Sequence, residues 1–276
     1  MKKLLISLFT LCIVSIPVSA ATWVAADRVS TVGEKLLSKN GLPATTKFKV
    51  VNGVADNSNV KVTNEIYISS TDLTYAGNDN EVAAVVANEI GHIINGQNSK
   101  NQLRNIAKTA INSKLSADNL VTSAVNREYL ASKTSLKDNK DADVTGADLM
   151  IQAGYNPLAG IVVITKTPGS TLEILQGKPA NSERAMYLYD YLTYNYPSKV
   201  KAGYGCKEYT AFLTYADPIV KTRNSNAKKL AKFNKEQEKN KALRAKNLAQ
   251  YKSTGLSGWD ASYQVLKSLT ESSEKK

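Results

Sequence analysis

The chain has 276 residues and a formal net charge of +12, with one histidine and two cysteines. No stretch beyond the first twenty residues reaches ~18 uninterrupted apolar residues, which excludes a membrane-spanning helix in the mature chain. Cys12 lies within those first residues, so Cys206 is the only other cysteine and an intramolecular disulfide is excluded too.

The N-terminus has the layout of a secretory signal peptide. Lys2 and Lys3 precede an apolar run from Leu4 to Val14, and Val18-Ser19-Ala20 is a small-residue cleavage signal. We therefore expect residues 1–20 to be removed, and the mature protein to be soluble and exported, either to a periplasm or to the medium. Loss of the two lysines lowers the net charge from +12 to +10.

The first elements of the mature chain are a helix and two strands. Apolar spacing predicts a helix from Arg28 to Lys39, which Asn40-Gly41 ends. β-Branched and aromatic residues predict strands at Lys47 to Val51 and at Val60 to Ile68, with turn residues between them. We expect these strands to form a hairpin or a small sheet.

The rest of the chain is predicted to be mostly helical. A helix from about Asp79 to Asn98 is capped by Asn78 or Asp79. A polar region reaching Asp141 and a loop at Thr167 to Ser182 interrupt the later helices, which are expected at about 101–114, 142–152, 158–166, 183–195 and 226–251. A helix, a small sheet and then many helices are typical of the α+β class.

The positive charge is concentrated near the C-terminus. Between Lys221 and Lys252 there are eleven basic residues against Glu236 and Glu238, a local net charge of +9. Such a helix can contact an anionic surface, either lipid or nucleic acid. Alternatively, it is a solvated face whose apolar stripe packs on the main domain, which we favour.

The predicted helix at 79–98 contains VVANEIGHIING, residues 85–96. At about 100° per residue its apolar side chains form a stripe, and from Val82 to Asn95 the only ionisable groups are Glu89 and His92. A buried carboxylate without a partner is costly. We therefore expect Glu89 to be offset by a metal, by a charge elsewhere or by a water-filled cleft.

The same stretch is one residue away from a zinc motif. In H-E-x-x-H, two imidazoles four residues apart bind zinc, and the glutamate takes a proton from the zinc-bound water. Here Asn88 occupies the first position, and an amide oxygen is a weak zinc ligand. His92 is the only histidine in the chain, so no other alignment supplies the missing imidazole.

Four motifs together resemble one family along the mature chain to about residue 200. They are NEVAAVVANEIGH at 80–92, EIYI at 65–68, NKDAD at 139–143 leading to AGYNP at 153–157, and Lys178-Pro179 followed by Arg184. In this order and spacing, the chain resembles the zinc metallopeptidases of peptidase family M48, the HtpX, BepA and CAAX prenyl endopeptidase type. The resemblance implies a zincin-like α+β domain over residues 21–200, followed by a basic helical extension over 201–276.

The family's site residues can be transferred position by position. The general-base glutamate falls on Glu89 and the second histidine ligand on His92, both intact. The substituted positions are the first histidine ligand, the glutamate ligand and a cleft histidine, which fall on Asn88, Asn139 and Lys178. The aspartate that supports the glutamate ligand falls on Asp143, and the downstream arginine falls on Arg184.

Several arrangements of these residues are open. Asp138, Asp141 or Asp143 can replace the third ligand, while Lys178 can pair with Glu89 in place of the metal charge. Asn88 and Asn139 are expected to hydrogen-bond to each other or to His92. Zinc, if it binds at all, is expected to bind weakly.

Two functions from different classes follow. The favoured one is an exported pseudopeptidase whose cleft strand, Glu65 to Ile68, binds an extended peptide or protein segment by strand addition. The alternative is an active metallopeptidase with a remodelled zinc site and Glu89 as general base. A weaker third interpretation places the function in the basic extension.

Overall fold

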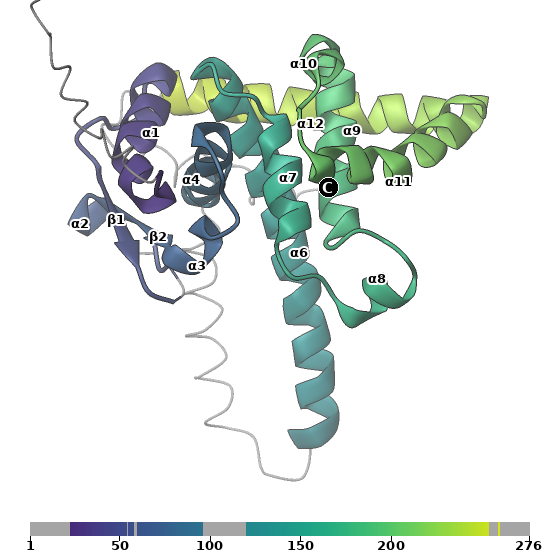
Figure 1. Ribbon diagram of the computed structural model, residues 1–276, viewed down its shortest axis with the longest axis horizontal. Coiled ribbons are helices and arrows are strands. Elements are labelled where there is room, and N and C mark those ends of the chain that lie inside the picture. Colours follow the sequence, from purple (N-terminus) through teal and green to yellow (C-terminus); the bar gives the residue numbers. More distant parts are fainter. Residues whose placement is uncertain (1–22, 54, 58–59, 96–119, 254–258, 260–276) are drawn as a thin grey trace, which may run out of the picture.

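The computed structural model describes residues 23–53, 55–57, 60–95, 120–253 and 259. The predicted signal peptide and the predicted helix at 101–114 lie outside these residues. The elements are α1 (Ala25–Asn40), β1 (Lys47–Val51), α2 (Val60–Thr63), β2 (Glu65–Ser69), α3 (Ser70–Leu73), α4 (Asp79–Ile94), α6 (Leu120–Gln152), α7 (Leu158–Lys166), α8 (Thr171–Leu175), α9 (Ser182–Asn195), α10 (Pro197–Ala202), α11 (Lys207–Asn224) and α12 (Ala227–Ser253). Figure 1 shows helices with one small sheet at the side, which confirms the α+β prediction.

The two strands pair in parallel, with Lys47 opposite Glu65 and Val51 opposite Ser69. The predicted small sheet is therefore confirmed, and its alternative, a hairpin, is wrong. Parallel strands need a connection that carries the chain back to its starting end, and α2 lies in this connection. Val60 to Thr63, predicted as strand, forms that helical turn instead, and Asn64 follows it with a positive φ of 53°.

The first hydrophobic core lies between α1, the sheet and α4. The predicted stripe of α4 is buried throughout, and Ala83, Ala87 and most other positions of the helix are buried as well. Asn78 caps α4, because its side chain accepts hydrogen bonds from the backbone N–H groups of Asn80 and Glu81. This confirms the first of the two predicted caps. Burial on nearly every side makes α4 the central helix of this half.

α4 and α6 cross at two glycines. A Cβ on Gly91 would lie 2.5 Å from the carbonyl oxygen of Ala142, and one on Gly146 would lie 2.9 Å from that of Ala87. Only glycine allows the backbones to approach so closely. The polar region before Asp141, predicted to be irregular, belongs to the single long helix α6, which presents Asn139 and Asp143 to α4.

A second core lies on the other side of α6, among α7, α9 and α11. Tyr209 and Phe212 of α11 belong to it, so the extension beyond residue 200 begins with a helix packed on the family-like region. The predicted helices at 158–166 and 183–195 are confirmed as α7 and α9, and the one at 226–251 as α12. The predicted loop between α7 and α9 contains the short helix α8.

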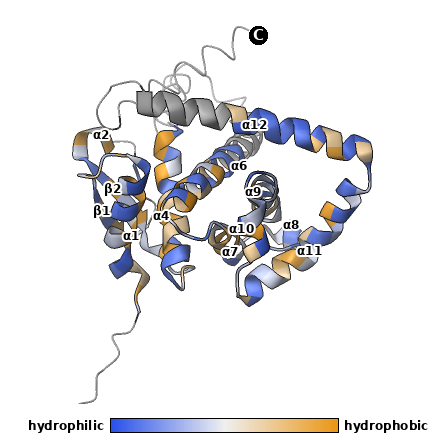
Figure 2. Ribbon diagram, turned by 90° about the horizontal axis from the view of Figure 1, so that it is seen from above, coloured by the Kyte–Doolittle hydropathy of each residue, from blue (hydrophilic) through white to orange (hydrophobic). Residues whose placement is uncertain are grey.

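α12 contacts α9 and α11, and the colours of Figure 2 show that most of its coloured residues are hydrophilic. Phe233 of α12 packs against α9 and α11. Its ring centroid lies 5.9 Å from that of Tyr194 and 3.7 Å from the Arg223 guanidinium. Packing of the basic helix is thus observed, whereas its contact with an anionic surface stays a prediction. In the described part of the chain, no helix is both long enough and apolar enough to cross a membrane.

Candidate functional site

The side chains of Asn88, Glu89 and His92 on α4 open onto a cleft of about 240 Å³. The walls come from α3, α4, α6, α7 and α9, so the cleft joins the two cores. Five positions on α4 and α6 that the sequence singled out line this cleft: Asn88, Glu89, His92, Asn139 and Asp143. Asp72 of α3 lines it too. Arg184 of α9 also lines it. The volume is below the ~300 Å³ at which pockets for whole small molecules begin, and suits a side chain or short segment.

The positions of the missing metal ligands are occupied by a network of hydrogen bonds. Asn88 donates from Nδ2 to Oδ1 of Asp143 at 2.7 Å. His92 Nε2 lies 3.1 Å from Oδ1 of Asn139. Each substituted ligand position therefore bonds to another residue of the site, Asn139 to His92 as expected and Asn88 to Asp143.

Asp143 is the centre of this network. The carboxylate is only 5% exposed, and Arg184 donates to both of its oxygens, with Nη2 to Oδ1 at 2.7 Å. Burial lowers the pKa of Arg184, but the charge and hydrogen bonds of Asp143 outweigh this effect and raise the pKa above its usual range. Arg184 is thus a permanent cation, and it neutralises Asp143 inside the cleft.

These residues do not fit a zinc ion. The amide oxygens of asparagine are poor zinc ligands. Nε2 of His92 forms a hydrogen bond with Oδ1 of Asn139, so a metal ion at this nitrogen would have to displace that bond. Within the residues that the structure describes, no group of three or more His, Cys, Asp or Glu side chains is placed to hold a metal ion.

The suggested substitutes for the third ligand do not assemble either. Asp143 is engaged with Arg184, and neither Asp138 nor Asp141 lines the cleft. The lost glutamate ligand is therefore not replaced by a neighbouring aspartate on α6.

Lys178 does not enter the cleft, so the proposed pair with Glu89 is wrong. Gly177 adopts φ 64° after α8, and the N–H of Lys178 then donates to the carbonyl of Glu173, which closes the helix in a tight reversal. The Glu173 carboxylate also accepts from the backbone of Asn181 and Ser182. This loop leaves Lys178 exposed at the surface.

Glu89 is held by an amide rather than by a cation. Nδ2 of Asn57 donates to Oε2 of Glu89 at 2.8 Å. Burial raises the pKa of Glu89 to about 7, and the hydrogen bond from Asn57 limits the rise. The negative charge of Asp72 raises this pKa further, while the charge of Arg184 lowers it. A carboxylate in this setting can exchange a proton near neutral pH.

Sequence reasoning missed two residues of this site. Asn57 lies in the connection before α2, which was interpreted only as turn residues, and it is 3% exposed. Asp72 lies in α3, just after the cleft strand. The sequence indicated that the carboxylate of Glu89 needs a partner. It did not indicate that Asn57 is this partner, because the two residues are far apart in the chain and share no motif.

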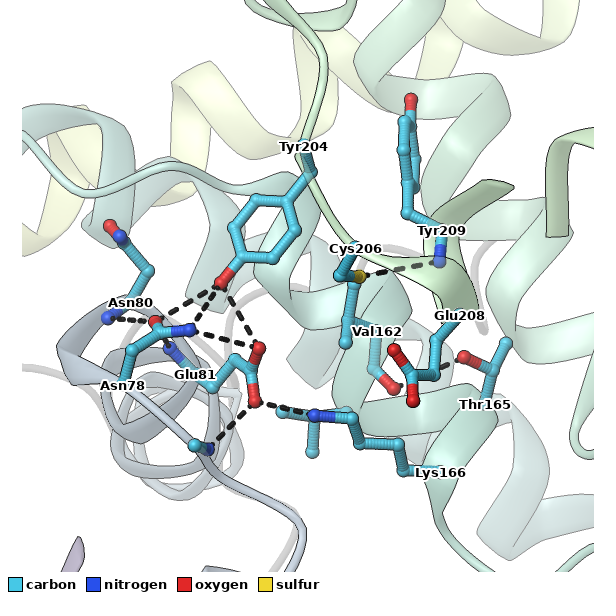
Figure 3. A network of polar contacts seen from close by, with 12 residues as sticks. Asn78, Asn80, Glu81, Val162, Thr165, Lys166, Tyr204, Cys206, Glu208 and Tyr209 are labelled. Atoms are coloured by element: carbon cyan, nitrogen blue, oxygen red, sulfur yellow. Dashed lines mark hydrogen bonds and ion pairs between the residues drawn. The ribbon is translucent and has the colours of Figure 1, made fainter. Parts of the chain in front are cut away.

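A second polar cluster lies at the other end of α4 (Figure 3). Glu81, 3% exposed, forms an ion pair with Lys166 of α7 at 2.8 Å. Its carboxylate also accepts from the backbone N–H of Gly77, from Asn78 Nδ2 and from the hydroxyl of Tyr204. This cluster ties α4 to α7 and to the segment after α10, and its carboxylate is fully supplied with donors.

A central helix with an adjacent glutamate and histidine, a third ligand position on a crossing helix and a small flanking sheet define the class: a zincin-like metallopeptidase fold. The chain belongs to peptidase family M48, whose family model matches residues 24–192. The match covers the helix α4, the α6 positions and most of α9, and it ends before residue 201, where the extension was predicted to begin. Comparison with curated proteins gave no match, and neither did comparison with solved structures.

Proposed function

We propose that this protein is an exported, non-hydrolytic member of the metallopeptidase family, a pseudopeptidase that binds an extended peptide or protein segment in its cleft. The observation that carries the proposal is the network at the ligand positions. Asn88 and Asn139 hydrogen-bond to Asp143 and His92, so both substituted ligand positions have partners without a metal ion. The N-terminal signal pattern supports export.

Charge balance supports the same conclusion. A zinc site needs the two positive charges of its ion to hold the ligands together. Here Arg184, whose side chain is 20% exposed, already neutralises Asp143, so this carboxylate offers no uncompensated charge to a metal ion. Removal of either partner would leave the other buried without its counter-charge.

Peptide binding is the role that the remaining parts of the cleft favour. β2 lies against α4, and Tyr67 at its middle is linked through Asn57 to Glu89. The cleft therefore adjoins a strand whose outer edge can pair with an extended segment. The small volume suits one side chain of that segment.

Hydrolysis of a labelled casein with added zinc tests the proposal. Wild type and Glu89→Gln should both release no more peptide than the buffer alone, because no group of ligands among the described residues is placed to hold the ion that activates water. The matched control is the double variant Asn88→His with Asn139→Glu, which restores three conventional ligands. Cleavage by the wild type that Glu89→Gln abolishes would establish the alternative, an active peptidase with Glu89 as base.

A further inference from the structure

The pairing with β1 determines which backbone N–H and C=O groups of β2 point to the outer edge of the sheet. Lys47 N–H donates to the carbonyl of Asn64 at 3.0 Å, so the backbone groups of Asn64 point towards β1. Hydrogen-bonding groups alternate along a strand, which directs those of Ile66 and Ile68 towards β1 as well. The N–H and C=O of Tyr67 therefore point away from β1, at the middle of the outer edge.

The side chain of Asn57 occupies this edge position. The Tyr67 N–H donates to Oδ1 of Asn57 at 2.7 Å, and Nδ2 of Asn57 donates to the Tyr67 carbonyl at 3.0 Å. In an antiparallel pair, two opposite residues exchange both of their N–H···O bonds in the same way. The carboxamide of Asn57 thus makes the bonds that one residue of an added antiparallel strand would make.

The same carboxamide also contacts the cleft. Its second N–H donates to Oε2 of Glu89, so all hydrogen atoms of the amide are used. Asn57 is 3% exposed and therefore lies between the strand edge and the helix rather than on the surface. A segment that pairs with Tyr67 cannot do so while Asn57 holds both of its backbone groups.

From this geometry we infer that Asn57 is a built-in competitor for the peptide-binding edge: an extended antiparallel segment pairs with Tyr67 only by displacing the Asn57 side chain, which also removes the donor from Glu89. The inference rests on the proposed peptide-binding function and adds its regulation. The partner is defined by its backbone, since the contacts at Tyr67 are main-chain bonds. The apparent affinity for this partner equals the intrinsic affinity multiplied by the fraction of molecules in which Asn57 has released Tyr67.

Binding of an extended peptide to purified full-length protein tests the inference. The probe is an acetylated, amidated peptide of alternating valine and threonine with a neutral dye, uncharged so that the basic α12 does not attract it. Asn57→Ala should bind it on the order of 10-fold more tightly than wild type, because two competing hydrogen bonds are removed. The matched control is Asn52→Ala, an exposed asparagine of the same connection that contacts Ser70, which should bind as wild type does.

A second variant separates edge pairing from other effects. The N–H of Tyr67 faces the outer edge, so Tyr67→Pro removes that donor without breaking the β1–β2 ladder. Added to Asn57→Ala, it should abolish the gain in affinity. If Asn57→Ala fails to fold, hydrogen exchange in wild type decides: the Tyr67 amide should be protected without peptide, and peptide should leave it protected while freeing the Asn57 side-chain amide.

The outcomes distinguish this inference from the function on which it rests. Equal affinity of wild type and Asn57→Ala, or binding by neither, overturns the role of Asn57 and leaves the loss of hydrolysis intact. Zinc-dependent cleavage of the probe by wild type overturns the pseudopeptidase proposal, while a tighter Asn57→Ala variant would still support Asn57 as the competitor. An Asn57 amide that is unaffected by bound peptide also contradicts the displacement.

Discussion

The two glutamates of α4 make the most instructive comparison in the molecule. Glu81 and Glu89 lie about two turns apart on one buried helix. Glu81 is met by the Lys166 ammonium and by donors from Gly77, Asn78 and Tyr204. Glu89 is met by the neutral amide of Asn57 and lies in the field of Asp72.

This difference in partners distinguishes Glu81, which has a structural role, from Glu89, which occupies the general-base position of the family. At Glu81 the chain supplies a cation and closes a network between helices. At Glu89 burial is only partly compensated, which raises the pKa to about 7 and is typical of functional sites. The predictions below start with the largest change expected in this contrast.

Replacement of Lys166 should have the largest effect on stability. Lys166→Met leaves Glu81 buried without its cation, and the free energy of unfolding should fall by about 3 kcal/mol. Urea denaturation at neutral pH measures this. The matched control is Lys49→Met, which breaks an ion pair of similar length with Glu65 at the surface and should lower the free energy of unfolding far less than Lys166→Met does. Similar losses in both variants would contradict the structural role of Glu81.

Replacement of Gly91, two residues after Glu89 on α4, should have the second-largest effect on stability. In Gly91→Ala the new methyl group would meet the Ala142 carbonyl at 2.5 Å, so α4 and α6 must separate. We expect a loss of about 2 kcal/mol in the free energy of unfolding. Gly205→Ala, where no atom lies within 4 Å, serves as control and should change stability little. An unchanged Gly91→Ala variant would show that the helices do not cross there.

The pKa of Glu89 predicts a stability that depends on pH. Because the folded state holds this proton to about pH 7 and the unfolded chain releases it near 4.5, stability falls as pH rises through this window. Glu89→Gln has no such proton, so relative to wild type it should gain about 2 kcal/mol between pH 5 and pH 8. Thermal unfolding at both pH values measures the gain, and an equal difference at both would refute it.

Tyr204→Phe should give the smallest effect. The hydroxyl is one of several donors to Glu81, and its loss should cost about 1 kcal/mol because Lys166 and the backbone donor remain. Tyr194→Phe, which removes a hydroxyl bonded to the exposed Glu238, is the matched control and should cost less. A loss as large as that of Lys166→Met would mean that Tyr204, not Lys166, dominates the cluster.

The helices were largely predictable where apolar periodicity, capping residues and stop residues indicate the same boundaries. Periodic apolar residues and stop signals located α1, α4, α7, α9 and α12, and the Asn78 cap was identified from its residue type. The direction of β2 was not predictable, because a turn-rich connection resembles a hairpin until the helical turn at Val60 to Thr63 is seen. The predicted helix at 142–152 is the C-terminal part of α6, whereas the earlier part of α6 was missed because it is polar and lacks the apolar period of a buried helix.

The site was predictable only where the family motif supplied positions. Asn88, His92, Asn139, Asp143 and Arg184 come together as the resemblance implies. Lys178 does not, because backbone geometry at Gly177 rather than residue type decides where its side chain points. Asn57 escaped prediction because a hydrogen bond across a tertiary contact leaves no spacing in the sequence.

The central claim is that hydrogen bonds of Asn88 and Asn139 take the place of metal ligation at the substituted positions of this chain. The most direct test is the zinc content of the purified mature protein, expressed with zinc available and dialysed against a weak chelator. We predict close to no zinc per chain for wild type, and close to one for the variant with Asn88→His and Asn139→Glu, which restores conventional ligands beside His92. One zinc per wild-type chain would contradict the account.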